Sequence, residues 1–181
     1  MTTLPDLLSP NLDILSVGLN PSLNAVKAGF YFATPQNRFW KALNASALID
    51  KPLTPSIESQ QTLLTDYRMG FTDTVKRPTS QGSALRSADF RTDCPILKEK
   101  ILKYSPRIVW FHGKVAYKNY LVVTENIKGG VDWGEQPWPI GSAQIFVTPN
   151  PSPANAAFSL ANLIDWYNKL ADFKKTHHKN E

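Results

Sequence analysis

Two short stretches of this 181-residue chain combine asparagine, proline and serine in a way that suits a ligand site: residues 18–22 (GLNPS) and 150–155 (NPSPAN). Asn20 is the side chain in the first stretch that both donates and accepts hydrogen bonds. Gly18 permits a tight backbone path, while Pro21 lacks an N–H and fixes its own φ angle. An Asn-Pro pair is also a common turn dipeptide, so on these residues alone a plain turn is the simpler interpretation.

Both stretches follow apolar runs that are typical of buried strands, at residues 12–17 and 144–147. In an open α/β sheet, ligands bind beyond the carboxyl ends of the strands. The aromatic residues 30–32 lie in the long connection over residues 18–37, and long connections in compact domains are often functional. The three segments together predict a slot with a hydrogen-bonding floor, an aromatic stacking wall and a rim.

The remaining chain alternates expected strands with expected helices. Residues 70–75 and 107–111 also read as strands, the latter because it is rich in β-branched and aromatic side chains. Helices are expected over about 37–43, over 57–67 with Ser56 as cap, from Asp89 or Thr92 to 104, over 114–121 and over 158–173, whereas 124–142 reads as loop. This alternation predicts an α/β fold, a three-layer α/β/α sandwich with a short, mainly parallel central sheet.

Length and composition indicate one globular domain over residues 1–181, with a polar tail from about residue 174. No apolar stretch approaches the ~20 residues needed to span a bilayer, and the N-terminus lacks the pattern of a secretory signal. Cys94 is the only cysteine, which excludes an internal disulfide and a cysteine-based metal site. We therefore expect a reducing, cytoplasmic setting.

The chain is basic, with a net charge of +5 and a pI near 9.3. Such an excess suits a polyanionic partner, but the basic residues are spread along the chain. A solvated basic surface explains the charge as well as a phosphate-binding face does.

A set of motifs runs along nearly the whole chain in one order. The motifs are GLNP at 18–21, GFYF at 29–32, NRFWK at 37–41, DYRMGFT at 66–72, VKRPT at 75–79, GK at 113–114 and NPS at 150–152. In this combination the chain resembles the mismatch-specific uracil/thymine DNA glycosylases, family 2 of the uracil-DNA glycosylase superfamily. Each motif alone is unspecific, and the resemblance rests on their shared order.

The resemblance implies a single α/β/α domain that removes uracil, and in some members thymine or exocyclic-adduct bases, mispaired with guanine. The target nucleotide is flipped out of the duplex, since its glycosidic bond is shielded in the stack. The product is an abasic site, and no metal or nucleotide cofactor takes part. The implied partner is double-stranded DNA with uracil or a mismatched base, bound by a monomer that is nucleoid-associated if the source is bacterial.

By this resemblance Asn20 is the catalytic residue, because it holds the water that attacks the sugar. A neutral amide positions a water but is a poor general base, so slow turnover is expected. Gly18, Leu19, Ala25 and Phe32 are the base-binding candidates. Backbone groups around Leu19 and Phe32 would bind the uracil edge, and the Phe32 ring would stack under the flipped base. Ala25 would leave room for a 5-methyl group, so thymine is not excluded.

The second loop is expected to contact DNA and to fill the hole left by the flipped nucleotide. Its candidate residues are Asn150, Pro151, Ser152, Pro153, Ala154, Asn155 and Ala156. Ser152 and nearby N–H groups would hold a phosphate. After Ser152 the chain departs from better-known relatives, in which Leu or Arg side chains fill the hole left by the flipped nucleotide. Asn155 would either bond the orphaned guanine or cap the last helix, so the preference for the opposite base stays open.

Several other polar residues are weaker candidates. Asp73 and Asp93 are alternative water activators that spacing alone does not exclude, and both rank below Asn20. His112 would lie at the rim of the site or in a structural position. His177 and His178 are too isolated to predict a metal site.

Two other function classes remain to be compared with a monofunctional DNA glycosylase. A non-catalytic module that binds mismatched or abasic DNA would keep the same fold and show salt-sensitive binding without base release. A nucleotide-binding α/β enzyme is disfavoured, because the chain has neither Gly-x-Gly-x-x-Gly nor Gly-x-x-x-x-Gly-Lys-Ser/Thr.

Overall fold

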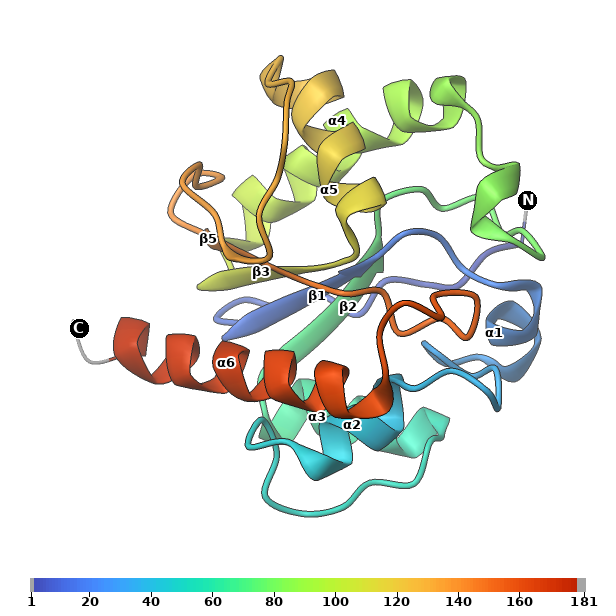
Figure 1. Cartoon of the computed structure of the whole chain (residues 1–181), viewed down its shortest axis with the longest axis vertical. Helices are drawn as coiled ribbons and strands as arrows, with labels where there is room; N and C mark the ends of the chain where they lie inside the picture. Colours follow the sequence, from blue (N-terminus) through green and yellow to red (C-terminus); the bar gives the residue numbers. More distant parts are fainter. Residues whose placement is uncertain (1, 179–181) are drawn as a thin grey trace.

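The computed structural model describes residues 2–178, which form a central sheet between two layers of helices (Figure 1). The sheet has five strands in the order β2-β1-β3-β5-β4. Their bounds are β1 Ile14–Gly18, β2 Met69–Asp73, β3 Ile108–His112, β4 Gly134–Glu135 and β5 Gln144–Thr148. Strands β2, β1, β3 and β5 pair in parallel with one another in that order. Strand β4 runs antiparallel to β5. The predicted three-layer fold with a mainly parallel sheet is confirmed.

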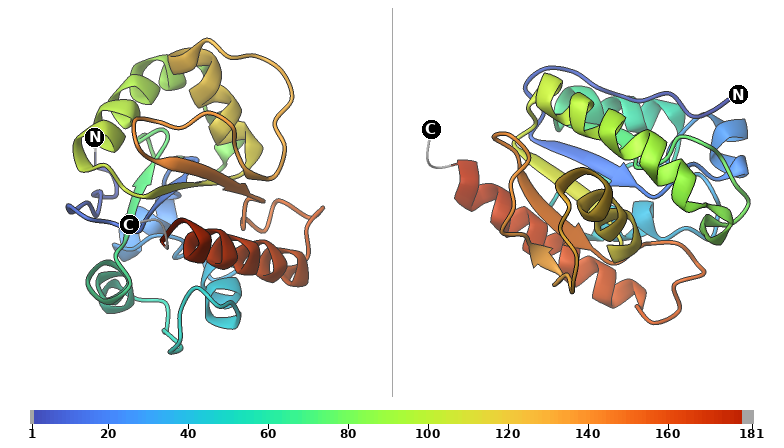
Figure 2. Two further views of the ribbon diagram at one scale, coloured as in Figure 1. Left: turned by 90° about the vertical axis from the view of Figure 1, so that its left-hand side faces the viewer. Right: turned by 90° about the horizontal axis from the view of Figure 1, so that it is seen from above.

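The helices divide between the two faces of the sheet (Figure 2). Their bounds are α1 Leu23–Ala28, α2 Phe39–Ala45, α3 Ile57–Asp66, α4 Ser87–Tyr104, α5 Lys114–Tyr120 and α6 Leu160–His178, with a short 3-10 turn at Gly82–Ala84 and a π-helical turn at Leu121–Glu125. Helices α2, α3 and α6 cover one face and share one apolar cluster. Helices α4 and α5 cover the other face and share a second cluster.

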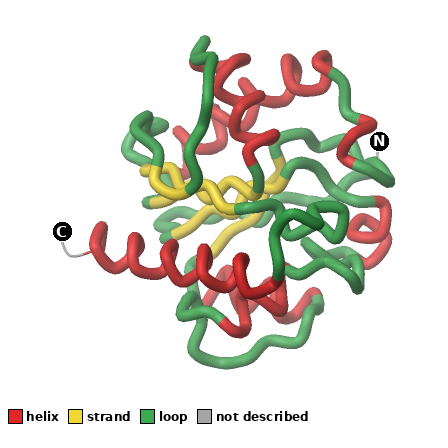
Figure 3. Tube along the Cα trace, viewed as in Figure 1, coloured by secondary structure: helices red, strands yellow, loops and turns green. Residues whose placement is uncertain are grey.

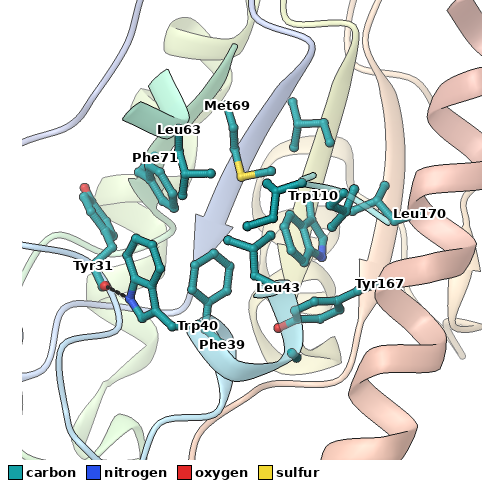
Figure 4. Packing of buried hydrophobic residues seen from close by; sticks show 14 of the residues in the cluster. Tyr31, Phe39, Trp40, Leu43, Leu63, Met69, Phe71, Trp110, Tyr167 and Leu170 are labelled. Atoms are coloured by element: carbon teal, nitrogen blue, oxygen red, sulfur yellow. Dashed lines mark hydrogen bonds between the residues drawn. The ribbon is translucent and has the colours of Figure 1, made fainter. Parts of the chain in front are cut away.

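The strands are buried on both faces, which is why they read as continuous apolar runs in the sequence. On the α2/α6 face, Phe39 lies at the centre of an aromatic group (Figure 4). Its ring centroid is 5.9 Å from that of Trp110 and 6.3 Å from that of Tyr167. This packing fixes the start of α2, and Figure 3 shows that the long connections gather beyond the strands near that point.

Helix α1 is absent from the sequence-based prediction, which treats residues 18–37 as one connection. The structure caps this helix at both ends: the Ser22 hydroxyl accepts a hydrogen bond from the Ala25 N–H, and Gly29 ends it in the left-handed region at φ 84°. Only Ala25 is buried among its six residues. So short a helix shows no apolar periodicity from which it could be predicted.

Two other helix bounds differ from the predicted ones. Helix α4 starts at Ser87, and Asp89 lies inside its first turn, where the carboxylate accepts the Arg86 N–H at 2.8 Å. Helix α6 continues to His178, through the first residues of the predicted polar tail. The rest of that tail, residues 179–181, lies outside the described residues. No helix within residues 2–178 is both long and apolar enough to cross a membrane.

Candidate active site

Four parallel strands bring polar residues to one edge of the sheet. Gly18 ends β1 and pairs in register with Asp73, which ends β2. On the other side of β1, His112 ends β3 and pairs with Thr148 at the end of β5. Both motif loops leave the sheet from this edge, since β1 ends at Gly18 and β5 ends at Thr148.

Gly18 lies against side chains from two other segments of the chain. A Cβ on Gly18 would lie 2.8 Å from Asp73 Oδ1 and 4.0 Å from Phe32 Cζ. The first distance is shorter than a real contact, so the position accepts only glycine without movement of its neighbours. The backbone of Gly18 is therefore in close contact with a carboxyl group and lies near the edge of an aromatic ring.

The Phe32 ring lies near Gly18 and packs against the aromatic core. It stacks on Phe39 with centroids 4.2 Å apart, and its edge meets His112 at 5.0 Å. Phe39 is fully buried whereas Phe32 is half-buried, so one face of Phe32 is supported by the core. Phe32 has φ 57°, an uncommon conformation outside glycine, and no acceptor among residues 2–178 takes its N–H. This unpaired N–H and the supported ring suit a planar polar ligand.

The Asn20 amide is oriented by two hydrogen bonds. Its Nδ2 donates to the Arg77 carbonyl at 2.9 Å and to Thr79 Oγ1 at 2.8 Å. The Thr79 hydroxyl in turn donates to the Gln81 carbonyl at 2.7 Å. Asn20 Oδ1 receives no hydrogen bond from the described part of the chain, and the residue is half-buried. The arrangement thus presents one fixed acceptor to a small donor such as water.

The remaining base-binding candidates have structural partners. The Leu19 carbonyl accepts the Val75 N–H at 3.0 Å, and its side chain reaches the backbone of Gly82. Ala25 is 3% exposed and belongs to the same apolar cluster that supports Phe32. Ala25 therefore faces this apolar cluster and not solvent.

Hydrogen bonds between its own residues stabilise the second loop. Asn150 Oδ1 accepts the Ser152 N–H at 2.9 Å, and the Asn150 carbonyl accepts Asn155 Nδ2 at 3.0 Å. Asn155 does not cap α6, because Ser159 Oγ accepts the Asn162 N–H there. Of the two predicted roles for Asn155, the capping role is therefore wrong. Pro153, Ala154 and Ala156 contribute only short side chains to the loop, and Pro153–Ala154 are exposed.

Arg38 fastens this loop, a role that the sequence analysis missed. Its backbone N–H and Nε both donate to the Pro151 carbonyl, at 3.1 and 3.4 Å. Its Nη2 donates to the carbonyls of Ser152 and Asn155 at 3.0 Å each, and Nη1 donates to that of Phe158. Because Arg38 directly precedes Phe39, one short segment supports both the Phe32 ring and the second loop. The NRFWK motif was the available signal, but it did not reveal the partners of Arg38.

The two alternative carboxylates occupy different places. Asp93 lies on α4, where Oδ2 accepts the Lys76 N–H at 2.7 Å. Asp73 lies at the sheet edge, 4% exposed, with Oδ2 3.2 Å from Lys76 Nζ. Burial raises the pKa of Asp73 to about 6, against the opposing charge and hydrogen bond of Lys76. Of the two carboxylates, only Asp73 therefore lies next to Gly18.

His112 is buried and neutral. Its Nε2 is 2.8 Å from Ser16 Oγ, whereas Nδ1 has no partner among the described residues. Burial lowers the pKa of His112 to about 3. Within residues 2–178, no group of three or more His, Cys, Asp or Glu side chains is arranged to hold a metal ion. His177 packs on Phe173, and the side chain of His178 lies outside the described residues.

The buried state of His112 predicts a loss of stability in acid. Its pKa is near 3 when folded and about 6.5 when unfolded, so the unfolded chain binds the proton first as the pH falls below 6.5. The stability contribution is complete above pH 6.5 and decreases by at most about 1.4 kcal/mol per pH unit below it. His112→Gln, which cannot titrate, should lose less free energy of unfolding between pH 6.5 and 4 than the wild type. Urea unfolding at the two pH values measures this, and parallel losses in both proteins would contradict it.

The chain is similar to known proteins over nearly its whole length. A family model described as the uracil DNA glycosylase superfamily matches residues 5–175. The solution NMR structure of a candidate uracil DNA glycosylase from Methanosarcina acetivorans is similar, with 25% sequence identity and a TM-score of 0.62. The alignment covers 97% of this chain and 98% of that chain. The chain belongs to the uracil DNA glycosylase superfamily.

Proposed function

We propose that this protein is a monofunctional DNA glycosylase that removes uracil mispaired with guanine and leaves an abasic site. The observation that carries the proposal is the acceptor of Asn20, which is fixed by two hydrogen bonds at the same sheet edge as Gly18 and Phe32. Superfamily membership supports the reaction type. The mismatch preference rests on the sequence resemblance.

The proposed reaction begins when the uracil nucleotide leaves the stack. Unpairing costs a few kcal/mol and costs less at a mismatch, which favours G·U over normal pairs. The base would then lie against the Phe32 ring, where stacking on one aromatic side chain contributes about 1–3 kcal/mol. The half-buried ring and its support from Phe39 suit this role.

Hydrolysis then exchanges one bond at the anomeric carbon for another. The C1′–N1 bond breaks and its electron pair leaves with the base, while the water oxygen bonds to C1′ and releases its proton to solvent. Asn20 Oδ1 would accept a hydrogen bond from this water and hold its lone pair toward the sugar. The unpaired N–H of Phe32 would donate to a uracil carbonyl, where negative charge develops.

The second loop would bind the DNA backbone beside the flipped nucleotide. The Asn150–Asn155 hydrogen bonds and the Arg38 contacts hold its backbone in one shape. The short side chains after Ser152 make a small wedge, so we expect weak selection for guanine as the opposite base. The chain would act as a single domain and as a monomer on double-stranded DNA.

The test is a duplex oligonucleotide that carries one uracil opposite guanine. The purified protein should produce strand breaks only after alkali treatment, because a monofunctional glycosylase leaves the backbone intact. A G·T duplex incubated with excess enzyme should also be processed, since the small Ala25 side chain would leave room for the 5-methyl group of thymine. Salt-sensitive binding to the duplex without any alkali-labile product would instead support a non-catalytic DNA-binding module.

A further inference from the structure

The two anchors of the Asn20 amide lie on one segment that is distant in the sequence. Asn20 Nδ2 donates to the Arg77 carbonyl at 2.9 Å and to Thr79 Oγ1 at 2.8 Å. The Thr79 N–H in turn donates to the Pro21 carbonyl at 3.1 Å. The direction of the acceptor Oδ1 of Asn20 therefore depends on the contacts that hold residues 77–79 in place.

That segment belongs to the connection over residues 74–86, which joins β2 to α4. The Arg77 side chain contacts both the middle of this connection and the helix after it. Its Nε donates to Asp89 Oδ1 at 3.0 Å and its Nη2 donates to Asp89 Oδ2 at 2.8 Å. Nη2 also donates to the Ala84 carbonyl at 3.1 Å. Because Asp89 lies in the first turn of α4, this one guanidinium fixes the start of the connection relative to the helix.

The Arg77–Asp89 contact suits positioning better than overall stabilisation. The two side chains are 38% and 19% exposed, and ion pairs near the surface contribute little to the free energy of unfolding. Two parallel N–H···O bonds nevertheless fix the relative orientation of a guanidinium and a carboxylate. The hydrogen bond from Arg77 lowers the pKa of Asp89 to about 2, so the carboxylate stays ionised at neutral pH.

The same guanidinium holds a turn that lies close to Asn20. The 3-10 turn Gly82–Ala84 receives the hydrogen bond from Arg77 at its last residue. A Cβ on Gly82 would lie 2.6 Å from Leu19 Cδ2 and 3.9 Å from Asn20 Oδ1. Movement of this turn would therefore change the immediate surroundings of the acceptor as well as its anchors.

We propose that Arg77 and Asp89 form a positioning pair for Asn20. Their contact holds the Arg77 carbonyl, and with it the amide that donates to this carbonyl, in the orientation that suits the attacking water. The inference rests on the proposed glycosylase function and adds to it two residues that act only through Asn20. The pair should therefore affect the rate of base release and leave the affinity for DNA nearly unchanged.

The experiment measures single-turnover uracil release from a G·U duplex, and binding to the same duplex, for Arg77→Ala and Asp89→Ala. Each substitution should lower the rate by about 10-fold, which is part of the 100-fold that misplacement of a reacting group by ~1 Å can cost. The dissociation constant should stay near the wild-type value. Since the two variants change the net charge in opposite directions, weaker attraction to DNA cannot explain a fall in rate that both share.

Double variants test the route through Asn20. Arg77→Ala/Asp89→Ala should be no slower than Arg77→Ala alone, because both substitutions remove the same contact. Arg77→Ala should have no added effect in the Asn20→Ala background. Thermal unfolding checks that the variants fold, and Asp89→Asn, which keeps one acceptor, is a milder variant that should show a smaller fall in rate.

Lys98→Ala is the matched control, since it breaks an ion pair of similar exposure on the same helix, between Lys98 and Glu125 at 2.8 Å. It should release uracil at the wild-type rate. Wild-type rates in folded Arg77→Ala and Asp89→Ala would overturn the positioning role alone. So would a further fall when Arg77→Ala is added to Asn20→Ala, or an equal fall in Lys98→Ala. Absence of uracil release by the wild type would overturn the glycosylase proposal, and this inference with it.

Discussion

Asn20→Ala should lower the rate of uracil release by at least about 100-fold, while binding to duplex DNA stays near the wild-type value. The substitution removes the fixed acceptor Oδ1, so the attacking water is no longer positioned, and misplacement of a reacting group by ~1 Å can cost 100-fold. Within residues 2–178, no hydrogen bond joins the Asn20 amide to Phe32 or to the second loop. Single-turnover kinetics and a parallel binding titration on a G·U duplex measure the two effects separately.

The two anchors of Asn20 provide graded variants. Thr79→Ser keeps the hydroxyl that accepts from Nδ2 and should retain most of the activity, whereas Thr79→Val should lose part of it. Asn119→Ala is the matched control, because it removes an exposed amide that bonds only within α5. Full activity in Asn20→Ala would show that the catalytic assignment is wrong.

Arg38→Ala should raise the KM for uracil-containing DNA by about 10-fold or more, with a much smaller change in kcat. The substitution deprives four loop carbonyls of a charged donor, and hydrogen bonds to charged groups contribute about 1.5–3 kcal/mol each where they are shielded from water. The second loop then samples shapes that do not fit the DNA backbone, while Asn20 and its anchors are untouched. The thermal unfolding temperature should also fall.

Arg38→Lys and Arg91→Ala separate geometry from charge. Lysine keeps the positive charge but lacks the planar fork, so it should restore only part of the lost affinity. Arg91 is an exposed residue on α4, and its removal lowers the net charge by the same amount. An unchanged KM in folded Arg38→Ala, or an equal rise in Arg91→Ala, would contradict a positioning role for Arg38.

The sequence predicted those helices and strands whose composition or capping residue is distinctive within a few neighbouring residues. The run at residues 107–111 lies within one residue of β3 (Ile108–His112), and Ser56 caps α3 with Oγ accepting the Ser59 N–H, as predicted. These features depend on neighbours in the chain. The α/β/α layers with a mainly parallel sheet followed from the alternation of such elements, whereas the order of the strands comes from the structure.

The missed features depend on contacts between distant parts of the chain. Arg38 reaches carbonyls that lie 113–120 residues away, so no local pattern indicates its role. The sequence predicts Asp73 only as an alternative water activator, and its place opposite Gly18 comes from the β1/β2 register. A shift of one residue would turn its carboxylate to the other face of the sheet. The roles of Asn20, Phe32 and the second loop came from the family resemblance and remain predictions.

The central claim is base release, and direct detection of the free base tests it. A duplex with a single G·U pair is incubated with the protein in molar excess, and released uracil is quantified by mass spectrometry beside alkali-labile sites. We predict equal amounts of free uracil and abasic sites, an intact strand before alkali, and loss of both products in Asn20→Ala. A protein that binds the duplex in a salt-sensitive manner but releases no uracil would contradict the claim.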